Sequence, residues 1–122
     1  MMEAKSSEAA PLPAFPGEVV CTLDDLVPGG GVCARVAGQQ VAIFYLPGEA
    51  PPLYALGNFD PIGRANVLSR GILCKIGDEL AVASPLYKQH FSLRTGRCLE
   101  DPQVAVPVWR VSLVGECVVV AP

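Results

Sequence analysis

Apolar residues occur along the chain in short runs that are rich in valine, isoleucine and aromatic side chains. The runs are three to six residues long and are bounded by glycine, proline, asparagine and aspartate. Such runs are typical of β-strands, and no segment has the apolar spacing of an amphipathic helix longer than about two turns. We therefore expect an all-β chain. The expected strands span residues 18–23, 32–36, 41–46, 53–56, 72–76, 79–83, 90–93, 97–99, 109–114 and 117–120.

Four pairs of these runs are separated by short connections that contain glycine, which predicts four β-hairpins. Residues 24–31 indicate a turn or one helical turn followed by a loop, and residues 47–52 a loop, because proline cannot donate to a strand ladder. Many short strands joined by tight turns predict an antiparallel sandwich or a small barrel. The connecting segments are residues 37–40, 77–78, 94–96 and 115–116.

The length of 122 residues suits one domain, and 51% hydrophobic residues are enough for a packed core. The net charge of −3 argues against non-specific binding to nucleic acid, and no apolar run approaches the roughly 20 residues of a membrane span. Residues 1–16 are rich in Ser, Ala and Pro and lack the apolar stretch of a signal peptide. We expect a disordered tail there and a cytoplasmic protein.

The chain has five cysteines and one histidine, His90, and no two cysteines lie within five residues of each other. Wide spacing and an odd number do not indicate a disulfide framework, and zinc sites usually contain a close pair. We expect free, mostly buried thiols and no metal site, although spacing alone leaves a Cys–His catalytic pair open. The cysteines are Cys21, Cys33, Cys74, Cys98 and Cys117.

Charge is unevenly distributed along the chain. Residues 61–98 contain six basic and two acidic residues, a net charge of +4, so the remaining residues carry −7. Two interpretations stay open: ordinary solvated charge on loops, or a basic docking face on an otherwise acidic domain.

Residues 84–96 resemble the second cluster-binding motif of Rieske ferredoxins and oxygenases, Cys-Pro-x-His-Gly followed by Phe and Thr-Gly. In this register Ser84 takes the position of the motif's cysteine and Tyr87 that of its histidine. The other motif residues are in place: Pro85, Phe91, Thr95 and Gly96.

Residues 58–71 resemble the first motif of the same family, Cys-Pro-His followed by a loop and Leu-Ser-x-Gly. With one inserted residue, Asp60 takes the cysteine position and Ile62 the histidine position. Without the insertion, these positions fall on Pro61 and Gly63. Neither register supplies a pair of ligands.

A Rieske centre needs two thiolates on one iron and two imidazoles on the other, and this chain has one histidine in total. The resemblance therefore implies an all-β Rieske-like [2Fe-2S] ferredoxin fold without the cluster. It implies one domain at residues 17–122, with a base of antiparallel strands from both ends of the chain and a small inserted subdomain at about residues 58–98.

Other contacts must then hold the two motif loops together. We expect Asp60, Ile62, Ser84 and Tyr87 to pack and hydrogen-bond in place of the ligands. In particular, the Tyr87 ring is expected to pack against Ile62, so that Tyr87→Ala lowers thermal stability.

Residues 55–61, 66–71 and 83–101 together resemble the small subunit of bacterial assimilatory NAD(P)H-dependent nitrite reductase. In that family the large subunit carries FAD, an iron–sulfur cluster and sirohaem. The resemblance implies a subunit of an oxidoreductase that reduces nitrite to ammonia in nitrate assimilation. It implies the large subunit as partner, with no cofactor, metal or catalytic residue on this chain.

Alternatives to this function remain. The chain could be a stand-alone Rieske-like interaction module for another redox partner, whereas the ligand count argues against an electron-carrying ferredoxin. Residues 29–31 are a glycine run without the spacing of a phosphate-binding loop, so the choice between NADH and NADPH cannot be made from this sequence.

Partners approach a Rieske-type domain at the end where its two motif loops meet. These loops keep their positive charge although the ligands are absent, so we expect them to contact an acidic surface of the large subunit. The residues expected at this contact are Arg64, Arg70, Lys88, His90, Arg94 and Arg97.

Overall fold

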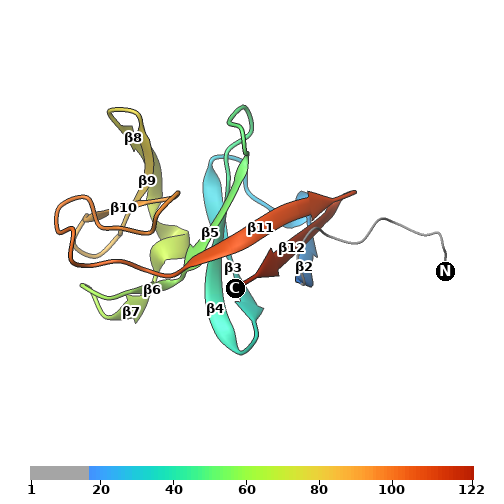
Figure 1. Ribbon diagram of the computed structural model, residues 1–122, viewed down its shortest axis with the longest axis horizontal. Coiled ribbons are helices and arrows are strands. Elements are labelled where there is room, and N and C mark those ends of the chain that lie inside the picture. Colours follow the sequence, from blue (N-terminus) through green and yellow to red (C-terminus); the bar gives the residue numbers. More distant parts are fainter. Residues whose placement is uncertain (1–16) are drawn as a thin grey trace.

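The computed structural model describes residues 17–122, which form eleven β-strands and two short 3-10 helices (Figure 1). The expected all-β class is confirmed. The disordered tail that we expect at residues 1–16 lies outside the described residues. The elements are β2 (Glu18–Thr22), η1 (Leu23–Asp25), β3 (Gly30–Val36), β4 (Gln39–Tyr45), β5 (Leu53–Gly57), β6 (Phe59–Asp60), β7 (Ala65–Asn66), η2 (Leu68–Arg70), β8 (Ile72–Ile76), β9 (Glu79–Ala83), β10 (His90–Ser92), β11 (Val108–Val114) and β12 (Cys117–Ala121).

The largest unit is a six-stranded antiparallel sheet with the order β2-β12-β11-β5-β4-β3. Its strands come from both ends of the described chain, because β12 pairs with β2 and β11 pairs with β5. The β3–β4 hairpin closes through Ala37 and Gly38, which both have positive φ, as the right-handed twist of a two-residue hairpin requires.

Two hydrophobic clusters lie on opposite sides of β4 and β5. Val41 and Ile43 belong to one cluster together with Trp109, while Ala42 and Phe44 belong to the other. Because neighbouring side chains of a strand point to opposite faces, the unbroken apolar run of β4 is buried on both sides.

The second cluster lies between the large sheet and a smaller part of the chain, on the left in Figure 1. This part contains the three-stranded sheet β10-β9-β8, the β6–β7 pair and η2. A Cβ atom at Gly71 would lie 2.5 Å from the carbonyl oxygen of Ala83, so glycine allows the end of η2 to approach β9 closely.

Three expected hairpins are present, and two details of the sequence interpretation are wrong. Residues 97–99 form no strand, and only the isolated bridge Phe91↔Cys98 marks the fourth hairpin, while a second bridge pairs Arg97 with Ala105 outside it. Strand β3 begins at Gly30, inside the expected loop. Its second residue, Gly31, pairs with Phe44 of β4, and glycine fits there because an added Cβ would lie 2.8 Å from a ring carbon of Phe44. The short elements β6, β7 and η2 were not expected.

Candidate functional site

Asp60 and Ser84, at the two positions that correspond to the Rieske cysteines, are joined by a hydrogen bond. Both side chains are fully buried, and the Ser84 hydroxyl donates to Asp60 Oδ2 over 2.5 Å. In a Rieske centre the two thiolates meet at one iron. Here a direct bond between the side chains links the two loops.

The remaining hydrogen-bonding capacity of this pair is used within the same loops. Asp60 Oδ1 accepts the N–H groups of Ile62 at 2.8 Å and Gly63 at 3.0 Å, and Ser84 Oγ accepts that of Leu86 at 3.3 Å. Buried polar groups that are fully paired specify a single geometry. The pair therefore fixes the backbone of both loops as well as their separation.

The two loops also repeat one backbone turn. The Arg64 N–H donates to the Asp60 carbonyl at 2.7 Å, and the Lys88 N–H donates to the Ser84 carbonyl at 3.1 Å. Arg64 has φ 63° and Lys88 has φ 66°, in the left-handed region that costs a non-glycine residue about 1 kcal/mol. We call residues 60–64 and 84–88 together the tip.

The positions that correspond to the Rieske histidines differ in burial. Ile62 packs against the second hydrophobic cluster, but Tyr87 is 66% exposed. The expected burial of the Tyr87 ring is therefore wrong. Instead Leu86 lies against Gly63, where an added Cβ would be 2.4 Å from Leu86 Cδ1.

The residues of the tip do not fit a Rieske cluster. The Asp60 carboxylate already accepts two backbone N–H groups and one hydroxyl, and no second imidazole is available in the chain. Within residues 17–122, no group of three or more His, Cys, Asp or Glu side chains is placed to hold a metal ion. No electron transfer step through a cluster is derived for this chain.

Three of the six expected docking residues have partners inside the protein. His90 Nδ1 lies 2.5 Å from Glu100 Oε2, and an Arg94 guanidinium nitrogen lies 3.4 Å from Glu79 Oε1. Arg97 donates to the carbonyl of Pro102 at 2.6 Å. These contacts hold the three side chains in place, and the Glu79 carboxylate lies beside the positive charge of Arg94.

The other three, Arg64, Arg70 and Lys88, are exposed and make no salt bridge within the part of the chain that is described. Lys88 follows Leu86 and Tyr87, which are 44% and 66% exposed, and Arg64 follows Gly63, against which Leu86 lies. Sequence reasoning missed Leu86, although its position beside the expected Tyr87 was a signal.

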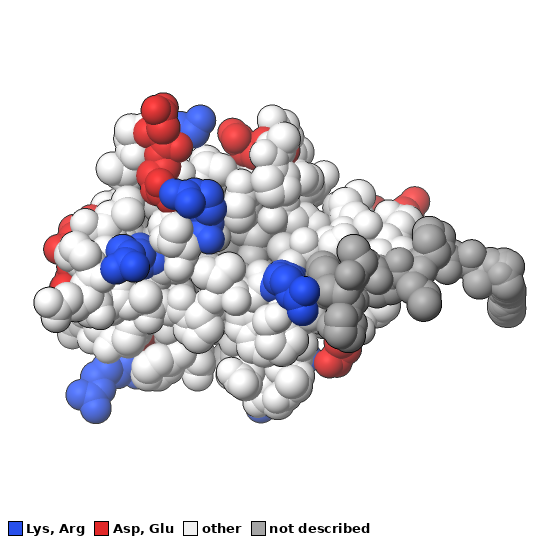
Figure 2. Space-filling model, viewed as in Figure 1, with Lys and Arg blue, Asp and Glu red and all other residues white. Residues whose placement is uncertain are grey.

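Figure 2 shows basic side chains dispersed over the face in view, with acidic ones between them, so this face has no continuous basic patch.

Glu79 and Glu100 are stabilised as carboxylates by their partners. The hydrogen bond from Ser92 and then the charge of Arg94 hold the pKa of Glu79 below its ordinary value of 4.5. Burial alone would raise the pKa of Glu100, but hydrogen bonds from the His90 backbone and ring lower it. Both carboxylates are therefore held by contacts inside the protein.

Three of the five cysteines are unsuited to nucleophilic chemistry. Burial raises the pKa of Cys98, the Glu100 carboxylate 3.7 Å from its Sγ raises it further, and burial also raises the pKa of Cys21 and Cys74. A raised thiol pKa lowers the fraction of reactive thiolate. All five thiols are free, but only Cys98 is buried and Cys33 is exposed, so the expectation of mostly buried thiols is wrong.

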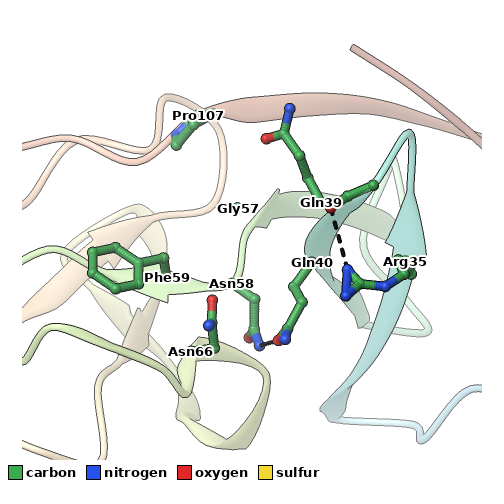
Figure 3. A pocket seen from close by; sticks show the side chains of 9 residues that line it. Arg35, Gln39, Gln40, Gly57, Asn58, Phe59, Asn66 and Pro107 are labelled. Carbon is green, nitrogen blue, oxygen red and sulfur yellow. Dashed lines mark hydrogen bonds between the residues drawn. The ribbon is translucent and has the colours of Figure 1, made fainter.

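A groove of about 390 Å³ lies between the β3–β4 hairpin and the start of β6 (Figure 3). At its floor, Asn58 is buried, donates to Gln40 Oε1 at 3.0 Å and accepts the Ser69 N–H at 2.7 Å. Arg35 donates to the carbonyl of Gly38. Amides and a guanidinium offer no general base or nucleophile, so the groove has no catalytic constellation.

Comparison with known proteins agrees with this geometry. A model of the Rieske-like [2Fe-2S] domain family matches residues 18–121. The nitrite reductase (NADH) small subunit of Salmonella typhimurium is 49% identical over 87 residues, which cover 71% of this chain and 80% of that protein.

Two further matches bear on the fold and on the partner. The solution structure of the nitrite reductase [NAD(P)H] small subunit from Erwinia carotovora has a TM-score of 0.72 at 45% identity, over 87% of this chain and 81% of that one. A nitrite reductase [NAD(P)H] large subunit from Klebsiella oxytoca is 41% identical over 102 residues, which cover 84% of this chain but 10% of that protein. A segment similar to this chain therefore forms part of a longer polypeptide in that relative.

Proposed function

The chain belongs to the family of nitrite reductase small subunits, and from this membership we propose that it is the accessory subunit of an NAD(P)H-dependent nitrite reductase. The holoenzyme reduces nitrite to ammonia in nitrate assimilation, in the cytoplasm. FAD, an iron–sulfur cluster and sirohaem belong to the large subunit. This chain contributes contacts and no catalytic residue.

The observation that carries the accessory role is the buried Asp60–Ser84 hydrogen bond at the positions of the Rieske thiolates. A serine hydroxyl and a carboxylate, both hydrogen-bonded within the protein, cannot replace the soft thiolate ligands of an iron–sulfur cluster. The similar segment within a large subunit of Klebsiella oxytoca supports direct physical association with the large subunit. We find no helix among residues 17–122 that is long and apolar enough to cross a membrane.

The tip is the part of the small subunit that we assign to the large-subunit contact. Leu86 and Tyr87 supply exposed apolar area, and Arg64 and Lys88 supply positive charge beside it. Arg70 is a further free cation, whereas His90, Arg94 and Arg97 contribute less because they are paired. Residues at the centre of a contact contribute most of its binding energy.

The accessory role is tested by purifying the large subunit with and without this chain and measuring nitrite-dependent oxidation of NADH and NADPH. We expect the two chains to co-purify and the activity to fall at least about fivefold without the small subunit, the fall that loss of a coupling of about 1 kcal/mol produces. Full activity and stability of the large subunit alone, with no co-purification, would overturn the proposal.

The assignment of the tip is tested with charge reversals in a pull-down at low salt and at 0.5 M salt. Arg64→Glu with Lys88→Glu is expected to abolish capture at low salt, and Arg94→Glu is the matched control because Arg94 is already paired with Glu79. Capture of the double variant equal to wild type at both salts would place the contact elsewhere.

A further inference from the structure

Strand β8 has an edge to which no other strand is bonded. In the three-stranded sheet the order is β10-β9-β8, and within residues 17–122 no bridge or backbone hydrogen bond reaches the outer side of β8. The β8–β9 hairpin projects from the smaller part of the molecule, at the upper left of Figure 1.

The register of the hairpin identifies which backbone groups face this free edge. Ile76 and Glu79 flank a two-residue turn and form a hydrogen-bonded pair, so the pairs Cys74↔Ala81 and Ile72↔Ala83 are bonded as well. The N–H and C=O groups of Leu73 and Lys75 then point outward. The Leu93 N–H donates to the carbonyl of Leu80, the partner of Lys75, so this carbonyl points toward β10 and away from β8.

The side chains beside this edge are apolar and exposed. Ile72 and Ile76 are 71% and 47% exposed, and both lie on the face opposite to Leu73, which packs against the second hydrophobic cluster. Natural proteins usually protect an edge strand with proline, a bulge or several charges. Strand β8 has no proline and no register shift, and Lys75 is its one charged residue.

The charge around β8 indicates what can bind there. Arg70, two residues before the strand, and Lys75 within it are exposed and make no salt bridge among the described residues, while Asp78 in the turn is the nearest acid along the chain. Two copies paired edge to edge would gather four of these cations and two aspartates, a net positive charge at the shared edge. An acidic segment would be attracted.

We propose that an extended, acidic segment of the large subunit adds to β8 as a fourth strand of the small sheet. The outward N–H and C=O groups of Leu73 and Lys75 pair with its backbone, and Ile72 and Ile76 contact its alternate apolar side chains. This inference rests on the proposed function for the identity of the partner, but it assigns a second contact that is separate from the tip.

The sharpest variant is Lys75→Pro, with Lys75→Thr as its control. The Lys75 N–H takes no part in the β8–β9 ladder, so proline there removes an outward donor and leaves the hairpin bonds intact. Both variants lose the same charge. We expect Lys75→Pro to bind the large subunit at least about tenfold more weakly than Lys75→Thr.

A second measurement does not depend on how proline affects folding. In the free wild-type chain the amides of Leu73 and Lys75 are expected to exchange with solvent faster than those of Cys74 and Ile76. On adding the large subunit, protection of Leu73 and Lys75 should rise by at least about tenfold. Unchanged protection in a complex that does form would overturn strand addition and leave the proposed function standing.

Failure of wild type to bind the large subunit at all would overturn both the proposed function and this inference. A concentration-dependent dimer of the small subunit alone that Lys75→Pro abolishes would show that a second copy occupies the edge. Equal affinities of folded Lys75→Pro and Lys75→Thr would also reject the strand addition.

Discussion

The six-stranded sheet and the smaller part of the chain are stabilised by different kinds of buried contact. None of the buried polar side chains of residues 17–122 lies beside the cluster of Val41, Ile43 and Trp109 on the outer side of β4 and β5. Residues 17–122 contain four buried polar or charged side chains. Asp60, Ser84 and Ser92 belong to the smaller part. Asn58 lies where that part joins the large sheet, and it bonds both Gln40 of β4 and the Ser69 N–H.

The difference shows what each kind of contact does in this protein. Apolar burial stabilises the large sheet without requiring one particular arrangement of its neighbours. Paired buried polar groups add less net stability but fix distances and directions. The two loops of the tip are turns, which cannot bond to each other through a strand ladder. Hydrogen bonds between buried side chains therefore fix how the two loops lie relative to each other.

The largest expected loss of stability follows a substitution in the apolar core of the large sheet. Ile43→Ala removes a fully buried side chain from the large sheet and should lower the free energy of unfolding by about 3 kcal/mol. Val19→Ala on the same sheet is the control, since Val19 is exposed, and should change it by less than about 0.5 kcal/mol. Denaturant titration measures both, and equal effects would contradict the assignment of the core.

Breaking the polar link at the tip should cost less than the core substitution. Ser84→Ala leaves Asp60 Oδ2 buried without its donor and should lower the free energy of unfolding by about 2 kcal/mol. Ser112→Ala in β11 is a matched control, because this serine is only partly buried and its hydrogen bond is long, at 3.5 Å. If the two serine variants unfold at the same denaturant concentration, the tip is held by other contacts.

Glycine at the strained tip positions should stabilise the protein while weakening its contact. Lys88→Gly accommodates the positive φ and should raise the free energy of unfolding by about 1 kcal/mol, while binding of the large subunit decreases. Lys75→Gly is the control with the opposite expectation for stability, since glycine weakens a strand interior. A Lys88→Gly variant that is destabilised would show that the lysine side chain makes contacts that outweigh the strain.

Acid should weaken the smaller part through its carboxylates. The pKa of Glu79 is lower in the folded chain than its ordinary 4.5, so its stabilising contribution is complete above pH 4.5 and is lost as pH falls through the lowered folded pKa. In Glu79→Gln the melting temperature should therefore depend less steeply on pH between about 5 and 3. The control is Glu116→Gln in the exposed β11–β12 turn, and an unchanged slope for Glu79→Gln would contradict the linkage.

The smallest effect on stability is expected for Tyr87→Ala, for which the sequence analysis predicts a loss of stability. Tyr87→Ala should shift the free energy of unfolding by less than about 0.5 kcal/mol, because the ring is mostly exposed. The same variant should bind the large subunit more weakly, since the ring supplies apolar area at the tip. A large loss of stability in this variant would instead support the packing of Tyr87 against Ile62 that the sequence analysis predicts.

The strands were predictable from residue order because hydrophobic runs report burial directly. The run from Val41 to Tyr45 and the turns at Gly77 and Gly115 are local signals, and the structure follows them. Strand β3 was misjudged at Gly30 because glycine usually marks a loop. In the structure the next glycine, Gly31, permits close approach to Phe44, a contact that depends on the tertiary fold.

The candidate site was only partly predictable for the same reason. Matching the motifs placed Asp60 and Ser84 at corresponding positions, which is where the structure joins them. Motif register does not tell which way a side chain points, so Tyr87 was assigned to the interior. Nor does it reveal contacts with distant carboxylates, which reduce the contribution expected of Arg94 and His90.

The pairing of β2 with β12 has a consequence for gene fusion. Glu18 lies opposite Val120, so the first and last strands run side by side in the large sheet, and neither belongs to the tip or to β8. A linker attached at either strand would keep the domain within reach of its partner at a millimolar effective concentration, without occupying either proposed contact. The same fold can therefore pass between a separate gene product and a segment of a longer polypeptide, as in the Klebsiella oxytoca relative, with no change in the surfaces that it presents.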